Sequence, residues 1–323
     1  MSAHITGVDF KAMEVEEPLP LHVNVDNLTF VYPNTNKPVL KDLNVQLAPG
    51  ARCLLIGANG SGKSTLLRLL AGRHLTKPEG AVTILGRDAF HDTRLNFERA
   101  FLDTDWGMRT VAFAGFGCPL QADIPVSDMM KALQAQYPER RDELIEMLGI
   151  DLNWRMHMVS DGQRRRVQIF IGLIRPFKIL LLDEVTVSLD VIVRMDLLKW
   201  LQKESDERGA TILYATHIFD GLDSWPTHVH YLNDQGCTGW QGKIEDLQLY
   251  KELREKGEPS PMLRIAESWL RKELLAKKER LKKGESLEPA SGTVAIEQKA
   301  TIDDLARGGG FSAGRMAGYD FIK

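Results

Sequence analysis

A nine-residue segment rich in glycine, residues 57–65, constrains the fold of this chain most strongly. It reads Gly-Ala-Asn-Gly-Ser-Gly-Lys-Ser-Thr and directly follows the apolar run 54–56. It matches the pattern G-x-x-x-x-G-K-[ST], in which glycines let consecutive backbone N–H groups turn inward around an anion. Residues 64–72 predict a helix, whose N-terminal dipole favours phosphate. The segment therefore predicts a strand, a phosphate-binding loop and a helix, and with them a nucleoside triphosphate site.

The polar groups of this segment have expected chemical roles. The ammonium of Lys63 is expected to reach the β and γ phosphates, and the hydroxyl of Ser64 is expected to ligate Mg²⁺. The expected nucleotide-binding residues of the segment are Gly57, Asn59, Gly60, Gly62, Lys63, Ser64 and Thr65.

Composition limits the remaining possibilities. With 323 residues, 43% of them hydrophobic, the chain can form one large α/β domain with extensions, or two modest domains. A net charge of −3 and a pI near 6.3 argue against phosphate-backbone binding as the main activity, so no direct nucleic-acid binding is expected. Cys53, Cys118 and Cys237 are too few and too scattered for a disulfide framework or a zinc cluster, which predicts buried thiols in a reducing compartment.

The first twenty residues contain acids and prolines but no apolar core of a signal peptide. Elsewhere, no uncharged run approaches the ~20 residues of a spanning helix. The sequence therefore predicts a soluble chain, cytoplasmic or nuclear.

Alternating patterns before the loop predict half-exposed strands. Polar and apolar side chains alternate over residues 22–32 and again over 39–47, and Pro33–Asn36 predicts a hairpin between them. A turn at Pro49–Gly50 then leads into a buried strand over 52–56.

After the loop, the pattern changes twice. Residues of about 127–175 have apolar side chains at three- and four-residue spacing, which predicts a helical insertion. The apolar runs 178–182 and 210–215 have the length of buried parallel strands and are separated by a helix-like stretch at 191–208. Together these elements predict a parallel-sheet α/β nucleotide-binding fold.

The ends of the chain differ from its centre in composition. Residues 1–20 predict a flexible N-terminal arm, and the Gly-rich tail 284–323 has the composition of a disordered segment. Between the core and this tail, 246–283 predicts a charged extension of one or two amphipathic helices, which we expect to pack on their own domain or on a dimer mate. A membrane surface or a calmodulin-type partner is the alternative. The expected apolar stripe consists of Leu263, Ala266, Leu270, Leu274 and Leu281.

A second candidate site element is the apolar run 179–182, which ends in Asp183 and Glu184. A buried strand that ends in a carboxylate places it at the carboxyl edge of the sheet, beside the phosphate loop. Asp183 is therefore expected to hold Mg²⁺ through water, and Glu184 to polarise an attacking water as general base.

A third element, Val-Ser-Asp-Gly-Gln-Arg-Arg-Arg-Val at residues 159–167, lies upstream of these carboxylates. It resembles the L-S-G-G-Q signature of ATP-binding-cassette (ABC) ATPases. The resemblance identifies Ser160, Gly162 and Gln163 as signature residues, and it covers about residues 21–245.

Further positions fit the same family pattern. The resemblance implies that Asp190 belongs to the D-loop, that His217 is the switch histidine, and that Tyr32 stacks on adenine. Gln121 is the candidate Q-loop glutamine, on the stretch that fits the pattern least well.

The resemblance implies an ABC ATPase fold over 21–245: a RecA-like parallel core, an antiparallel β subdomain and a helical subdomain at about 119–175. It implies hydrolysis of ATP with Mg²⁺ held by Ser64, Gln121 and Asp183, and with Glu184, His217 and Lys63 as catalytic residues. It also implies a head-to-tail homodimer in which Ser160 and Gly162 of one protomer cap the γ-phosphate bound by the other.

The chain departs from the family pattern at positions that bear on catalysis. Asp161 replaces the first glycine of the signature, Val159 replaces its leucine, and Val185 replaces the proline that usually follows the catalytic glutamate. Because Asp161 places a carboxylate near the partner's phosphates, slow basal hydrolysis is expected.

The sequence around these departures resembles that of a small eukaryotic branch of the family. This branch comprises a fungal ABC ATPase associated with the carbon-catabolite-repressor/Not complex and the plant soluble class I proteins. Three functions follow: an ATP-driven dimerisation switch in a regulatory complex, the ATP-binding subunit of a transporter with separate membrane chains, or a scaffold that binds nucleotide without useful turnover. Asp161 is the only hint of the third, and the presence of Asp183, Glu184 and His217 disfavours it.

Overall fold

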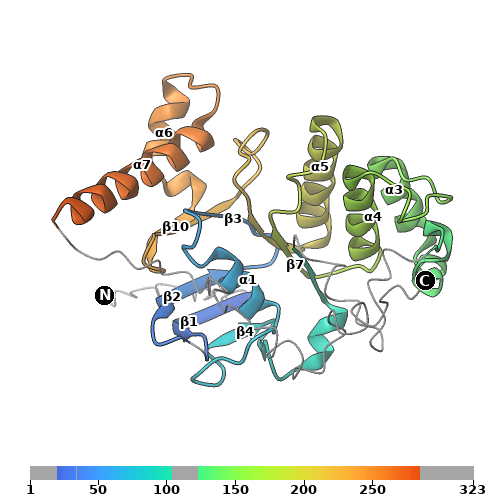
Figure 1. Ribbon diagram of the computed structural model, residues 1–323, viewed down its shortest axis with the longest axis horizontal. Helices are drawn as coiled ribbons and strands as arrows, with labels where there is room; N and C mark the ends of the chain where they lie inside the picture. The colour runs from blue at the N-terminus through green and yellow to red at the C-terminus, as the bar shows by residue number, and fades with distance from the viewer. Residues whose placement is uncertain (1–19, 34, 104–122, 284–323) are drawn as a thin grey trace, which may run out of the picture.

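A computed structural model of the protein describes residues 20–33, 35–103 and 123–283 (Figure 1). Its strands are β1 (Val23–Val31), β2 (Pro38–Leu47), β3 (Arg52–Gly57), β4 (Val82–Ile84), β5 (Arg87–Asp88), β6 (Arg99–Leu102), β7 (Ile179–Asp183), β8 (Thr211–Ala215), β9 (His228–Leu232) and β10 (Thr238–Lys243). Its α-helices are α1 (Lys63–Leu70), α2 (Lys131–Gln136), α3 (Pro138–Leu148), α4 (Asp161–Leu173), α5 (Val191–Arg208), α6 (Gln248–Glu255) and α7 (Pro261–Lys282). Short 3₁₀ turns are η1 (Thr93–Phe97), η3 (Val126–Asp128) and η4 (Ile244–Asp246).

The main sheet has six strands in the order β10-β9-β3-β8-β7-β6. All neighbouring pairs in it are parallel except β10 with β9, which is antiparallel. Every residue of β3, β7 and β8 is buried, because helices and a second sheet cover both faces. These are the runs that the sequence predicts to be buried parallel strands.

The second sheet is antiparallel, in the order β2-β1-β4-β5. Buried and exposed residues alternate along much of β1 and β2, as expected for strands with one solvated face, and the two strands form the predicted hairpin. Helix α1 lies between the two sheets (Figure 1), and its leucines share one core with both.

The opposite face of the main sheet carries helices α4 and α5, and α3 packs beside them (Figure 1). The predicted helix at 191–208 is confirmed as α5. The predicted helical stretch at 127–175 consists of η3, α2, α3 and α4, with a non-helical segment between α3 and α4. A parallel sheet, an antiparallel sheet and a helical layer thus form the predicted α/β architecture.

The C-terminal extension forms the helices α6 and α7, at the side of the molecule opposite α3 (Figure 1). The predicted apolar stripe of α7 is correct in part: Ala266 is buried and Leu270 packs on the core, whereas Leu263, Leu274 and Leu281 are exposed. The buried face also contains Met262 and Ile265, which the predicted stripe leaves out. Both faces are regular at helical spacing, so periodicity alone does not distinguish them.

Two of the cysteines lie within the described residues. Burial raises the pKa of the Cys53 thiol to about 12, which makes it an inert core side chain. Cys237 is half-buried, contrary to the expectation of a buried thiol, because it lies on a surface turn. Cys118, the N-terminal arm 1–19 and the tail 284–323 lie outside the described residues.

Within the described part of the chain, no helix is both long and apolar enough to span a bilayer.

Candidate active site

The candidate site lies where three neighbouring parallel strands end. β8 lies between β3 and β7 in the sheet, so the carboxyl ends of all three meet at one edge. β3 leads into the glycine loop, β7 ends at Asp183, and β8 leads to His217. Residues from three distant parts of the sequence are therefore brought together.

The glycines of the loop are required by its geometry. Gly60 and Gly62 have φ angles of 84° and 101°, a conformation that L side chains rarely adopt. A Cβ on Gly57 would lie 2.5 Å from both the Leu232 carbonyl oxygen and the Ser61 hydroxyl oxygen. The loop therefore turns tightly around a small space, and Asn59 and Gly60 are exposed at its tip.

Lys63, the first residue of α1, directs its side chain back over this loop. It is only 7% exposed, and its Nζ donates hydrogen bonds to the carbonyl oxygens of Gly57 (2.7 Å) and Ala58 (3.0 Å). Burial lowers the pKa of Lys63, whereas the charges of Glu184, Asp183 and Glu273 raise it. The ammonium is thus held at the mouth of the loop, where incoming phosphate would replace the carbonyl oxygens.

Asp183 and Ser64, the two described residues that the sequence predicts to bind Mg²⁺, lie next to each other. The Ser64 hydroxyl donates to the buried Asp183 carboxylate, and the Oδ1 atom of Asp183 has no hydrogen-bond partner. Burial raises the pKa of Asp183. A buried, unpartnered carboxylate oxygen beside a hydroxyl fits Mg²⁺, which prefers oxygen ligands.

Glu184 lies beside Lys63 and His217. Its Oε1 atom is 3.2 Å from His217 Nε2, and its backbone N–H donates to the Ala215 carbonyl at the end of β8. The backbone φ of Glu184 is 54°, an uncommon conformation for this residue type that places its side chain at the strand end. Burial raises its pKa, against the opposing charge of Lys63, and burial lowers the pKa of His217.

Tyr32 extends from the end of β1 toward the start of α1. Its hydroxyl lies 3.1 Å from the hydroxyl oxygen of Thr65. Its ring packs edge-on against Phe30 (centroids 5.0 Å) and His74 (5.3 Å). An aromatic side chain is therefore held beside the start of α1, and its stacking on adenine stays a prediction.

The signature residues lie on the other side of the main sheet. Ser160 caps α4 in a reciprocal arrangement with Gln163, in which each side chain bonds the other's backbone N–H. A Cβ on Gly162 would lie 3.2 Å from the Ser188 carbonyl oxygen, so the signature turn touches the turn that leads into α5. Within the described residues, no hydrogen bond or ion pair joins these residues to the loop at 57–62.

Asp190 caps α5 and ties it to α4. Its carboxylate accepts from the Val193 N–H (3.0 Å) and pairs with Arg166 (2.5 Å). These bonds lower the pKa of Asp190. The signature turn and the D-loop thus form one unit at the N-terminal ends of α4 and α5.

Comparison with known proteins agrees with this geometry. The sequence profile of the family described as "ABC transporter" matches residues 40–187. "ABC transporter I family member 20" of Arabidopsis thaliana is 45% identical over 305 residues, which cover 91% of this chain and 90% of that protein. The chain belongs to the ABC transporter family. It is an ATP-binding cassette, and its activity is that of an ATPase.

Two further comparisons identify a fungal relative and a solved structure with the same fold. "CCR4-associated factor 16" of Saccharomyces cerevisiae is 38% identical over 239 residues, covering 69% of this chain and 77% of that protein. A solved dimeric ATP-binding cassette in a post-hydrolysis state, bound to ADP and Pi, superposes with a TM-score of 0.57 at 21% identity and covers 70% of this chain and 100% of that one. The predicted ABC ATPase fold is thereby confirmed, as is the predicted relation to the plant class I and fungal proteins.

Gln121 lies outside the described residues, so its role in the Q-loop stays a prediction. Asp161 is fully on the surface, with a side chain 91% exposed, and pairs with Arg164 at 2.8 Å. Solvent and this arginine therefore both screen its charge in the single chain.

A buried polar cluster near Glu184 is not predicted by the sequence patterns. The hydroxyls of Thr186 and Tyr214 lie 2.5 Å apart, and Tyr214 also bonds Thr216. Burial raises the pKa of Tyr214. The cluster joins the segments after β7 and β8, which carry Glu184 and His217. The polar tyrosine in the apolar run 210–215 was the available signal, since a buried tyrosine hydroxyl usually finds a partner.

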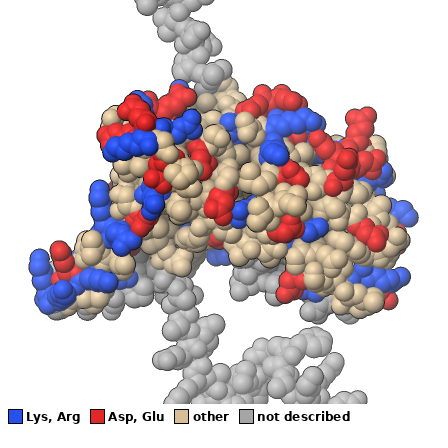
Figure 2. All heavy atoms as spheres, turned by 90° about the horizontal axis from the view of Figure 1, so that it is seen from above, with Lys and Arg blue, Asp and Glu red and all other residues tan. Residues whose placement is uncertain are grey.

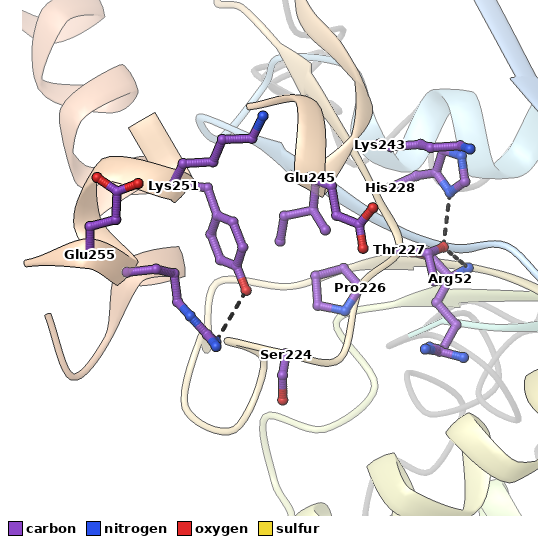
Figure 3. Close-up of a pocket in the computed structure, with 12 residues that line it drawn as sticks. Arg52, Ser224, Pro226, Thr227, His228, Lys243, Glu245, Lys251 and Glu255 are labelled. Carbon is purple, nitrogen blue, oxygen red and sulfur yellow. Dashed lines mark hydrogen bonds between the residues drawn. The ribbon is translucent and has the colours of Figure 1, made fainter. Parts of the chain in front are cut away.

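A cavity of about 750 Å³ lies elsewhere (Figure 3). Arg52 and His228, the first residues of β3 and β9, line it together with Lys251 and Glu255 from α6. It therefore lies at the amino ends of the strands, away from the glycine loop, and it is distinct from the nucleotide site.

Proposed function

We propose that this ABC ATPase is an ATP-driven dimerisation switch within a cytoplasmic or nuclear regulatory complex. Binding of ATP and Mg²⁺ closes a head-to-tail homodimer, and hydrolysis reopens it. The observation that carries the proposal is the division of the site. Lys63, Asp183, Glu184 and His217 gather at one sheet edge, whereas no hydrogen bond or ion pair among the described residues joins the signature turn of the same chain to them.

The residues at the sheet edge fit hydrolysis of ATP. The loop N–H groups and Lys63 bind the phosphates, and Ser64 and Asp183 hold Mg²⁺ together with Gln121. The metal, when bound, neutralises phosphate charge. Glu184 accepts a proton from the attacking water, and His217, 3.2 Å away, orients that carboxylate and contacts the γ-phosphate.

The signature face fits a second copy of the chain. Exposed apolar side chains surround the signature turn and the D-loop, which is unusual for a surface in contact with water only. These are Met158 (75% exposed), Val187 (58%), Val191 (65%) and Ile192 (74%). In the proposed dimer this face covers the partner's glycine loop, and Ser160, Gly162 and Gln163 contact its γ-phosphate. The resemblance to a cassette solved as a dimer with ADP and Pi supports this arrangement.

Hydrolysis should weaken at mildly acidic pH. Burial raises the pKa of Glu184, and a general base acts only when deprotonated, so kcat falls as pH drops through that raised pKa. The acid limb of the kcat profile should therefore lie above the pH at which an ordinary glutamate titrates. A steady-state profile whose acid limb lies at the ordinary glutamate pKa would contradict the assignment.

Asp161 should slow the wild-type enzyme. Its carboxylate opposes the partner's phosphates, and Asp161→Gly removes about 1 kcal/mol of repulsion, which corresponds to a roughly fivefold rise in the steady-state rate. Arg164→Ala is the matched variant and should lower the steady-state rate, because it leaves the Asp161 carboxylate unpaired. Equal rates for wild type and both variants would remove Asp161 from the control of turnover.

The regulatory role rests on the relatives. The yeast relative carries the name of a CCR4-associated factor, and the two proteins share 38% identity. A second candidate, the ATP-binding subunit of a transporter with separate membrane chains, is favoured by a different relative. The "Sulfate/thiosulfate import ATP-binding protein CysA" of Synechocystis sp. is 33% identical over 226 residues.

Tagged purification of the Glu184→Gln form in the presence of MgATP distinguishes these two functions. The trapped dimer should retain its partner, and subunits of a gene-regulatory complex are the expected result. Recovery of membrane permease subunits would overturn the regulatory role and establish the transporter subunit.

A further inference from the structure

The C-terminal helix α7 contacts the same end of the sheet as the nucleotide site. Trp269 of α7 stacks on Tyr231 of β9, with ring centroids 4.6 Å apart and planes at 20°. It also stacks on Trp240 of β10 at 6.1 Å. Together with the buried Met262 and Ile265, these rings fix the axis and the rotation of α7 against β9 and β10.

One helical turn further on, α7 binds the turn between β9 and β10. The Glu273 carboxylate accepts a hydrogen bond from the Asp234 N–H (3.0 Å). Arg280 pairs with the Asp234 carboxylate at 3.2 Å. Both the backbone and the side chain of Asp234 are therefore held by the helix.

The β9–β10 turn is itself stiff. The Asn233 side chain accepts from the N–H groups of Gln235 and Cys237, both at 3.0 Å, and the backbone of Asn233 bonds Gly236 and Cys237. A displacement of Asp234 is consequently transmitted to the whole turn.

The far side of this turn contacts β2, which packs on the glycine loop. The Gly236 carbonyl accepts from the Lys41 N–H (3.0 Å), and a Cβ on Gly236 would lie 1.9 Å from the Val39 carbonyl oxygen. Leu40, between these two residues of β2, packs on Gly62, where a Cβ would lie 2.6 Å from its Cδ2 atom. The contacts thus run without interruption from Glu273 to the glycine loop.

We infer that α7 is a positioning element of the ATP site, with Glu273 and Arg280 holding the glycine loop through Asp234 and the β9–β10 turn. The inference rests on the proposed ATP site and adds its regulation. Because coupling between two sites is reciprocal, a partner that moves α7 changes ATP affinity, and ATP changes the mobility of α7. Lys and Arg side chains gather where α7 ends, at the left of Figure 2, beside the exposed Leu274 and Leu281, so the helix is accessible to such a partner.

Glu273 also lies close enough to the site to act on it electrostatically. It is one of three carboxylates whose charges act on Lys63, and the other two are Asp183 and Glu184 of the site itself. Helix α7 lies outside the matched family segment 40–187, so this contact belongs to the extension of this chain.

The test is MgATP affinity of the full chain, measured by isothermal titration calorimetry, together with KM and kcat for hydrolysis. Replacing Glu273 and Arg280 together by Ala should raise Kd and KM about tenfold and change kcat far less. Glu273→Gln alone, with Arg280 intact, should bind MgATP far more nearly like wild type than the double variant does, because its amide oxygen still accepts from the Asp234 N–H. Lys272→Ala with Glu279→Ala, two exposed side chains of the same helix, is the matched control and should bind like wild type.

A lower melting temperature without a change in Kd would overturn the inference, because it shows a merely structural role. If the double variant does not fold, hydrogen exchange of the wild type replaces it: MgATP should slow exchange at Asp234 and along α7, and unchanged exchange there would overturn the inference. Failure of the wild type to bind MgATP would instead overturn the proposed function itself.

Discussion

Glu184→Gln should lower ATP hydrolysis by about 10²–10⁴-fold while MgATP still binds. Glutamine has nearly the same shape as glutamate but cannot accept a proton at neutral pH. The glycine loop, Lys63 and Asp183 remain intact in this variant, so affinity is preserved. Phosphate release measures the rate, and calorimetry at equilibrium measures the binding.

The control is Glu207→Gln, which makes the same chemical change on the exposed surface of α5. It should hydrolyse ATP at the wild-type rate. Wild-type turnover by Glu184→Gln would exclude Glu184 as the general base and indicate that another group near Lys63 has this role.

Arg140→Met should lower the free energy of unfolding by about 3–5 kcal/mol. Arg140 and Glu204 are 5% and 3% exposed, and Arg140 Nη1 donates to Glu204 Oε1 at 2.9 Å. The guanidinium also packs over the Trp200 ring at 4.6 Å and donates from Nε to the Leu173 carbonyl. Loss of the guanidinium leaves the buried Glu204 carboxylate without this partner and removes the bonds that join α3 to α4 and α5. Urea denaturation without nucleotide measures the effect.

Two variants separate the buried pair from ordinary surface charge. Arg208→Ala removes the half-exposed second partner of Glu204 and should cost about 1 kcal/mol or less. Arg140→Met combined with Glu204→Leu removes both buried charges and should recover much of the lost stability. A cost for Arg140→Met no larger than that of Arg208→Ala would contradict the role assigned to the buried pair.

The sequence predicts best those elements whose defining residues are adjacent in the chain. The glycine loop needs consecutive N–H groups, so its residues 57–65 are adjacent in the chain. Asp183 and Glu184 follow a buried strand directly, and parallel strands bring their carboxyl ends together. Local chemistry and one rule of sheet topology therefore suffice for the sheet-edge half of the site.

The remaining features depend on contacts between distant segments. The short strands β5 and β6 carry little pattern of their own and form by pairing with β4 and β7. Helix α7 has apolar side chains on more than one face, and its packing on β9 and β10, through Met262, Ile265 and the stack of Trp269 on Tyr231, selects the buried one. The link from Glu273 to the glycine loop passes through Asp234 and β2, which no spacing in the sequence reveals.

The central claim is that two copies of this chain enclose MgATP between the glycine loop of one and the signature turn of the other. Sedimentation of the Glu184→Gln variant tests it most directly, because this variant binds ATP without consuming it. We expect one 36.3 kDa species without nucleotide and, with MgATP, a species of twice that mass, which Ser160→Arg should abolish. A variant that remains at 36.3 kDa with saturating MgATP bound would contradict this claim.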